Sequence, residues 1–344
     1  MKRIITTLSA AAISGAALAL AAPAALADTT QTILDRGKVI CGVNGSRAGF
    51  SSIDSQGRWI GLDVDTCRAI AAAALGDAEA TEFVKTTSQT RFTALQTGEI
   101  DVLTRNTTMT YSRDAELGVD FAAITFYDGQ GFMVPTSLGI STVEELDGAS
   151  ICVLPGTTAE QVVESVFSER GMSYTPIVFQ DAKELASAFF GGRCDAHIQS
   201  TSGLASTRST LAPNPADYQI LEEVFDKDPM GPVVRQDDAR WKDTVTWVVN
   251  AMITAEELGI TSGNAEEMRA TGSDSIKTLL GANDSDIGAP LGLSNDWVFN
   301  IVSQVGNYGE VFDRNLGAGS PLGLARGQNA GWTDGGLIYA APLK

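Results

Sequence analysis

The stretch FTALQTGEIDVLTRNTTMTYSR, residues 92–113, is the part of the sequence from which the fold can be worked outward. It begins as a short apolar helix that stops at Gly98, and residues 100–103 follow as a buried parallel strand interrupted only by Asp101. The chain then becomes polar over residues 104–110 before another helix begins. This order of helix, strand and polar loop is typical of one unit of a parallel α/β sheet.

Arg113 stands out at the start of that next helix. Thr110 and Ser112 both suit the N-cap position, but a cation in the first turn opposes the helix dipole. A bound anion would explain the arginine, because free backbone N–H groups, threonine hydroxyls and a guanidinium group could converge on one carboxylate. The alternative is an ordinary exposed arginine at the end of a loop.

The first 27 residues have the composition of a secretory signal peptide. Lys2 and Arg3 precede a run rich in alanine and leucine, and cleavage is predicted after Ala27. Removal of these 27 residues from the 344 leaves 317, a length typical of about two domains. No later apolar run approaches the roughly 20 residues that a membrane helix needs. No cysteine stands near the cleavage site, so no lipid anchor is predicted.

The chain is strongly acidic. Its formal net charge is −18, and loss of Lys2 and Arg3 with the signal makes the mature charge −20. Nucleic acid is an unfavourable partner for such a surface, and self-repulsion keeps acidic proteins soluble and monomeric. We therefore predict a monomer that does not bind nucleic acid, in which a few cations gathered in one cleft could still hold a small anion.

Four cysteines are present, an even number that suggests disulfides in an exported protein. Three pairings are possible. We favour Cys41–Cys67, which joins a strand to its following helix, and Cys152–Cys194, which joins two strands of one sheet; four buried free thiols are the alternative. The chain has no CxxC spacing and one histidine, His197, so no zinc site is predicted.

The remaining sequence predicts two α/β lobes. Predicted strands lie at residues 39–43, 81–86, 100–103, 150–154 and 177–179. Residues 126–134 read as a strand that crosses between the lobes, and residues 228–234 as the return. We therefore expect lobe one at residues 28–130 plus 233–344 and lobe two at 131–232. Two crossings describe a hinge, which suits closure around a small ligand.

An internal similarity supports one plan for both lobes. Residues 94–102 and 188–196 both read as helix, glycine stop and strand beginning with an aspartate. Ligands of open α/β sheets bind beyond the carboxyl ends of the strands. Asn106 and Ser200 fall at equivalent offsets after the two segments, so we expect both at a shared cleft.

Several segments together resemble the periplasmic solute-binding proteins of general or polar L-amino-acid ABC transporters, which are solute-binding protein family 3. They are 61–69 (GLDVDTCRA), 91–103 (RFTALQTGEIDVL), 105–108 (RNTT), 127–134 (YDGQGFMV), 231–235 (GPVVR), 304–310 (QVGNYGE) and 325–327 (ARG). The resemblance implies a type II periplasmic-binding fold in which two lobes, each a sheet flanked by helices, are joined by a two-strand hinge. It also implies a periplasmic protein that delivers its ligand to an inner-membrane ABC permease, and it supports the two disulfides.

The resemblance further implies a set of ligand-binding residues. Arg113 corresponds to the arginine that grips the ligand α-carboxylate, with Asn106 and Thr108 beside it. Thr157 and Thr158, at the start of a lobe-two helix, would clamp the same carboxylate from the other side. The predicted site is completed by the following residues: Arg105, Arg47, Phe50 and Ser200.

Three positions depart from the family pattern. Ser200 stands where an aspartate usually holds the ligand ammonium, Met109 where tryptophan is frequent, and Arg47 where an apolar residue is usual. Loss of an acid and gain of a base make the cleft more positive by two charges. This favours a ligand with an additional acidic group, or one without a free amine. The alternative is that Arg47 points to solvent and the ammonium contacts backbone carbonyls.

These observations predict a binding protein rather than an enzyme. Its ligand would be an L-amino acid of acidic or amide type, such as glutamate, aspartate, glutamine or asparagine. Aspartates at residues 283–288 loosely suggest calcium, but their spacing does not match an EF-hand, so no metal or other cofactor is predicted. Three alternatives stay open: a binding protein for an organic acid without an amine, a periplasmic enzyme such as a dehydratase, which would need a placed acid or base, and a sensory domain that presents ligand to a receptor.

Overall fold

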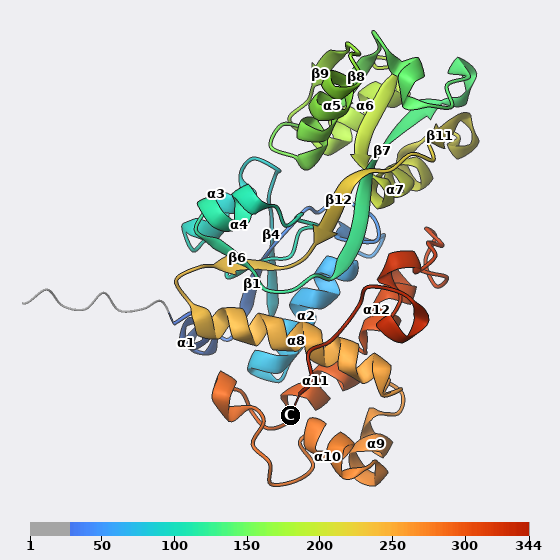
Figure 1. The fold of residues 1–344 in the computed structure, drawn as a ribbon. Helices are drawn as coiled ribbons and strands as arrows, with labels where there is room; N and C mark the ends of the chain where they lie inside the picture. The colour runs from blue at the N-terminus through green and yellow to red at the C-terminus, as the bar shows by residue number, and fades with distance from the viewer. Residues whose placement is uncertain (1–27, 344) are drawn as a thin grey trace, which may run out of the picture.

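Two separate β-sheets organise the protein, and the computed structural model describes residues 28–343. The first sheet contains, in spatial order, β4 (Thr81–Lys85), β1 (Val39–Val43), β5 (Val102–Leu103), β13 (Val233–Arg235) and β6 (Val119–Phe121). The second contains β11 (Tyr218–Ile220), β7 (Phe126–Pro135), β10 (Ala196–Ser200), β8 (Ser150–Val153) and β9 (Thr175–Val178). Figure 1 shows them as two lobes, in agreement with the type II periplasmic-binding fold expected from the sequence.

Helices flank both sheets. Those before the second lobe are α1 (Thr29–Arg36), α2 (Leu62–Leu75), α3 (Arg91–Gln96) and α4 (Tyr111–Glu116). The second lobe holds α5 (Thr158–Glu169), α6 (Ala182–Phe190) and α7 (Thr201–Leu211). After the return come α8 (Ala239–Glu257), α9 (Ala265–Thr271), α10 (Asp274–Leu279), α11 (Trp297–Gln304) and α12 (Tyr308–Asn315). No helix within residues 28–343 is both long and apolar enough to cross a membrane.

Residues 92–113 fold as predicted, except that the strand is shorter than expected. α3 is followed by Gly98 at φ 76°, and β5 pairs in parallel with β1. β5 covers only Val102–Leu103 of the predicted residues 100–103. At Asp101 the backbone N–H still donates to the Ile40 carbonyl at 2.8 Å, but the side-chain carboxylate accepts from the Ile40 N–H at 2.7 Å, so the regular ladder begins one residue later.

The two lobes share one local plan. Asp101 and Asp195 occupy equivalent places, before β5 and before β10. The Asp101 carboxylate accepts from the backbone N–H of Ile40 in β1, and the Asp195 carboxylate accepts from the N–H of Ser150 in β8, at 2.8 Å. Each aspartate therefore fixes a strand start against its neighbouring strand, which explains the repeated glycine–x–x–aspartate pattern of the sequence.

Two antiparallel strands connect the lobes (Figure 1). β7 runs from the first lobe into the second, and β12 (Phe225–Met230) returns beside it, with Asp128 opposite Asp228. The expected two-strand hinge is thus present. The exact lobe limits, 28–130 plus 233–344 and 131–232, stay a prediction. The signal peptide and its cleavage after Ala27 also stay a prediction, because residues 1–27 lie outside the described part of the chain.

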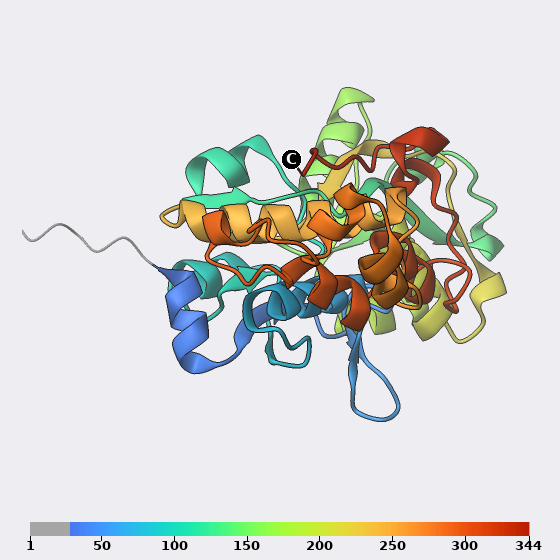
Figure 2. The same ribbon diagram turned by 90° about the horizontal axis from the view of Figure 1, so that it is seen from below.

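The C-terminal third of the chain enlarges the core of the first lobe. Figure 2 shows the gold and orange helices in front of part of that lobe, where α2 packs against both α8 and α11. Trp241 of α8 and Trp297 of α11 are fully buried there. The tail also reaches the hinge, because the Asn329 side chain accepts from the N–H of Tyr127 at 2.6 Å and donates to its carbonyl at 2.9 Å.

Both favoured disulfides are formed. Cys41 of β1 joins Cys67 of α2, and Cys152 of β8 joins Cys194 before β10, with Cα–Cα distances of 6.3 and 5.7 Å. The first bridge joins a strand of the first sheet to the helix that covers it, and the second joins a strand of the second sheet to the segment that leads into its neighbouring strand. The alternative of four free thiols is therefore wrong for this structure.

Replacing Cys152 and Cys194 together by serine is expected to lower the free energy of unfolding by about 4 kcal/mol, because a cross-link across 42 residues restricts the unfolded chain. The pair Cys41–Cys67, with a separation of 26, should cost slightly less, about 3–4 kcal/mol. Urea unfolding of each paired variant beside the wild type measures the difference. Unchanged midpoints for both variants would contradict the expectation.

Candidate ligand-binding cleft

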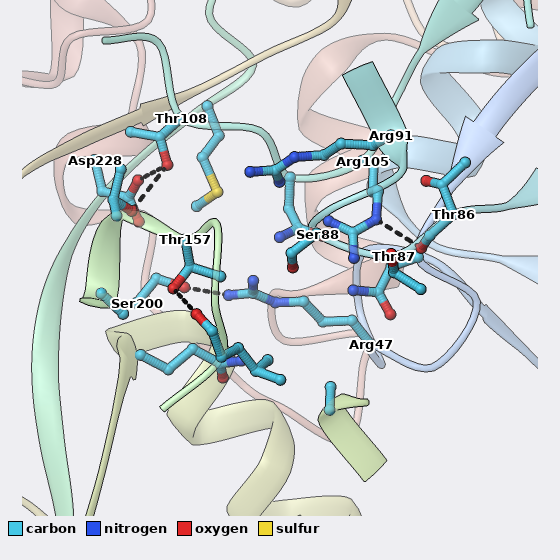
Figure 3. Close-up of a pocket in the computed structure, with 18 of the residues that line it drawn as sticks. Arg47, Thr86, Thr87, Ser88, Arg91, Arg105, Thr108, Thr157, Ser200 and Asp228 are labelled. Carbon is cyan, nitrogen blue, oxygen red and sulfur yellow. Dashed lines mark hydrogen bonds between the residues drawn. The ribbon is translucent and has the colours of Figure 1, made fainter. Parts of the chain in front are cut away.

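A cleft lies between the lobes, and four arginines line it. Arg47, Arg91 and Arg105 enter from the first lobe, as Figure 3 shows, and Arg113 enters from α4. They come from the loop after β1, the start of α3 and the polar segment after β5. The loops that carry Arg47 and Arg105 follow the carboxyl ends of the neighbouring parallel strands β1 and β5. The fold therefore brings together cations that are far apart in sequence.

Eight of the nine predicted ligand-binding residues line this cleft: Arg47, Arg105, Asn106, Thr108, Arg113, Thr157, Thr158 and Ser200. Phe50 is not among its lining residues. Its ring is fully buried and packs edge-to-face against Phe126, with centroids 5.2 Å apart. The Arg47 guanidinium lies 4.7 Å above the Phe50 ring, so Phe50 supports a cleft residue from beneath.

Arg47 points into the cleft rather than to solvent. It is 9% exposed and donates hydrogen bonds to the hydroxyls of Ser200 and Ser202, the latter at 3.2 Å. Glycine at position 203 makes room for it, because a Cβ there would lie 2.3 Å from the Arg47 guanidinium. The alternative in which Arg47 faces solvent is therefore wrong. Burial lowers the pKa of Arg47, and the carboxylates of Asp128 and Asp228 oppose that shift.

Two other arginines reach across to the second lobe. Arg91 and Arg113 each donate to the carbonyl of Gly156, both at 3.3 Å. Arg113 also donates to the Thr108 carbonyl at 2.9 Å, and its backbone N–H donates to the N-cap hydroxyl of Thr110. The two bonds to Gly156 and the Arg47–Ser200 bond join the lobes in this closed arrangement.

Arg105 and Asn106 form the floor on the first-lobe side. The Arg105 Nε donates to the Thr86 carbonyl at 3.0 Å, and burial, followed by repulsion from Arg47, lowers the pKa of Arg105 to about 10. Asn106 adopts φ 34°, a left-handed conformation that is costly outside glycine. Its N–H donates to Asp63 at 2.9 Å, which holds this turn in place.

The second lobe presents a helix N-terminus to the cleft. Thr157 caps α5 by accepting from the Glu160 N–H at 3.4 Å. The Thr158 hydroxyl accepts from the Gln130 amide at 3.1 Å and lies 3.4 Å from the Thr108 hydroxyl of the first lobe. Free N–H groups and the positive end of the dipole at this helix start are suited to an anion.

Asp228 is the acidic group that the sequence analysis missed. It is 2% exposed and accepts hydrogen bonds from the Thr108 hydroxyl and from the Gln130 amide, the latter at 2.7 Å. Burial raises the pKa of Asp228 to about 6. Its signal in the sequence was a lone carboxylate within the return crossing, which is otherwise mostly apolar.

Arg91 was also missed as a site residue, although it opens one of the family-like segments. It is 3% exposed, and burial together with Arg105 and Arg113 lowers its pKa strongly. Its position at the start of a helix resembles that of Arg113, which was the available signal. Within residues 28–343, no cluster of three or more histidine, cysteine or acidic side chains is placed to hold a metal ion.

Residues 39–261 match the model of the bacterial extracellular solute-binding proteins, family 3. The chain belongs to this family. Within it, the chain is 48% identical to the general L-amino acid-binding periplasmic protein AapJ of Rhizobium johnstonii, with 97% of this chain and 98% of AapJ covered.

Two further family members are similarly close. The glutamate/glutamine/aspartate/asparagine-binding protein BztA of Rhodobacter capsulatus is 49% identical, with 96% of this chain and 98% of BztA covered. A solved ABC transporter periplasmic binding protein from Brucella ovis with glutathione bound is 49% identical and superposes with a TM-score of 0.90, covering 92% of this chain and all of that one. By their names these relatives are binding proteins.

Proposed function

We propose that this family 3 protein captures an acidic or amide L-amino acid in the periplasm and delivers it to an inner-membrane ABC permease. The observation that carries the proposal is the convergence of four arginines on one cleft in a chain whose net charge is −18. The names of AapJ and BztA support an amino-acid ligand. A monomeric state, without cofactor, remains part of the proposal.

The charges of the cleft support a ligand with two anionic ends and one cationic centre. Arg113 and the α5 N-terminus would bind the α-carboxylate. Asp228 would accept hydrogen bonds from the α-ammonium, because it is the lining carboxylate not already capping a helix; Asp181 caps α6. Arg91, which shares a carbonyl acceptor of the second lobe with Arg113, would lie at the α-carboxylate end, and Arg47 would meet the side-chain carboxylate or amide. Asp228 also makes an organic acid without an amine the weaker alternative.

A calorimetric screen of the mature protein tests this function. We expect glutamate, aspartate, glutamine and asparagine to bind, and leucine, lysine and glutarate to bind at least about 100-fold more weakly, because each leaves a buried charge of the cleft unpaired. Recovery of the ligand unchanged after long incubation separates a binding protein from an enzyme. Tight binding of leucine or lysine, or turnover of the ligand, would contradict the proposal.

The charge at position 47 is expected to select acidic over amide side chains. Arg47→Gln should weaken glutamate binding by about 10- to 100-fold and glutamine binding by much less, since a hydrogen bond between charged groups contributes about 1.5–3 kcal/mol. Gly203→Ala should act in the same direction without removing the charge, because the added methyl displaces the guanidinium. Arg240→Gln, at an exposed site, is the control; equal losses for both ligands would refute the assignment.

A further inference from the structure

A second hollow adjoins the ligand cleft at Arg47, between the loop after β1 and helices α6 and α7. We refer to it as the annex. Six residues line both the cleft and the annex: Asn44, Ser46, Arg47, Leu154, Ala182 and Gln199. Arg47 therefore lies between two adjoining hollows rather than at the end wall of one.

The annex is positively charged although the protein is acidic. Arg47, Lys85 and Lys183 line it, and no aspartate or glutamate does, in a sequence with 42 acidic and 24 basic residues. Neither lysine takes part in an ion pair within residues 28–343, and the Lys85 amine lies 5.8 Å from the centre of the Trp59 ring. Among the described residues, the two lysines are exposed and unpaired, and no carboxylate lines the annex itself, which leaves this space suited to an anionic group.

Two residues of β10 that line the annex, His197 and Gln199, each carry a buried polar atom without a partner in the described part of the chain. His197 is 2% exposed, and its Nδ1 has no hydrogen-bond partner among the described residues. The same holds for the buried Oε1 of Gln199. Burial followed by repulsion from Arg47 lowers the pKa of His197 to about 3, so the imidazole is neutral and able to exchange a hydrogen bond with an amide. Buried unpaired groups of this kind are costly unless a partner reaches them.

We propose that the annex binds the distal, carboxylate-bearing part of a γ-linked glutamyl peptide whose glutamyl head occupies the amino-acid cleft. The inference rests on the proposed function, because a γ-glutamyl peptide keeps its α-carboxylate and α-ammonium free for the same contacts as glutamate. Arg47 donates to the γ-amide carbonyl, β10 meets the peptide amides, and Lys85 and Lys183 attract the terminal carboxylate. The glutathione bound to the Brucella ovis relative is a γ-glutamyl peptide of this kind.

Calorimetry with matched ligands tests the annex. S-methylglutathione is the probe, since its blocked thiol leaves the two disulfides intact, and its glycine amide lacks the terminal carboxylate. We expect S-methylglutathione to bind, and amidation to weaken it by about tenfold. Lys85→Gln/Lys183→Gln should weaken S-methylglutathione by about tenfold, as two partly solvated ion pairs would, and leave both the amide and glutamate within twofold. Lys277→Gln, far away in α10, is the matched control.

Three results would overturn the proposal, in two distinguishable ways. If glutamate binds but S-methylglutathione does not, or if the double lysine variant binds the peptide and its amide as the wild type does, the annex assignment fails while the amino-acid function stands. If neither glutamate nor the peptide binds, the proposed function itself fails and the annex fails with it.

Discussion

Arg113→Ala is expected to lower the affinity of the protein for glutamate by at least about 100-fold. A guanidinium group binds a carboxylate through two parallel hydrogen bonds, and hydrogen bonds to charged groups contribute about 1.5–3 kcal/mol each. The substitution also removes a contact of the closed state, because Arg113 donates to the Gly156 carbonyl of the second lobe at 3.3 Å. Calorimetric titration at pH 7.5 measures the loss.

Arg113→Lys serves as the conservative comparison for this prediction. It preserves the charge but not the planar fork, so we expect an intermediate loss of affinity. Arg240→Ala removes an exposed arginine from α8 and should bind as the wild type does. An Arg113→Ala variant that binds glutamate within threefold of the wild type would mean that Arg113 only supports closure and that another arginine grips the α-carboxylate.

Asp228→Asn is expected to weaken glutamate binding by about 100-fold at pH 7.5. The variant keeps the shape of the side chain and removes the negative charge that would meet the ligand ammonium. Because burial raises the pKa of Asp228 to about 6, the wild-type affinity should also fall by about tenfold at pH 5, where most of the carboxyl is protonated. The affinity of Asp228→Asn for glutamate should not show this tenfold fall between pH 7.5 and pH 5, because asparagine does not titrate.

The contribution of Asp228 to the stability of the ligand-free protein should have the opposite pH dependence to the affinity for glutamate, and should be higher at low pH. The folded pKa of Asp228 lies above its unfolded value, so the folded state binds the additional proton. The resulting stability is present at pH below the unfolded pKa and is lost as the pH rises through about 6. Asp228→Asn should therefore become more stable than the wild type above that pH, by an amount that thermal unfolding between pH 4 and 8 measures.

A pH-independent difference in melting temperature between Asp228→Asn and the wild type would contradict this linkage. Asp63 provides an internal reference, because burial raises its pKa to about 6 as well. It lies beneath Asn106 and accepts from its N–H, outside the lining of the cleft. Asp63→Asn should change the pH dependence of stability but affect the pH dependence of binding far less than Asp228→Asn does.

Much of the fold could be predicted because its signals are local. Gly98 ends a helix whose apolar residues face the sheet, and residues 39–43 are a short apolar run suited only to a buried strand. The repeated aspartate before β5 and β10 predicted two lobes with the same local order of helix, glycine and strand. Thr157 and Arg113 could be placed at helix starts for the same reason, since capping and dipole rules depend on neighbours along the chain.

The site was harder to predict where it depends on contacts between distant segments. Arg47 and Ser200 are 153 residues apart, and their hydrogen bond depends on closure of the lobes and on the missing Cβ of Gly203. Phe50 was expected at the ligand and instead packs beneath Arg47 in the core. The sequence pattern of a loop does not specify which of two neighbouring side chains turns inward, because that choice follows from the space left by other elements.

The sequence by itself therefore predicted the two lobes and the hinge, because periodicity and glycine stops act over short distances, and its motifs carried the family resemblance. It favoured one disulfide pairing, which the structure then confirmed. Only the tertiary structure decided the charge balance of the cleft. It placed Arg91 and Asp228 beside the predicted residues and left the annex without carboxylates. Burial and electrostatic interaction depend on distances in space, which a strand pairing such as Asp128 with Asp228 sets across 100 residues of chain.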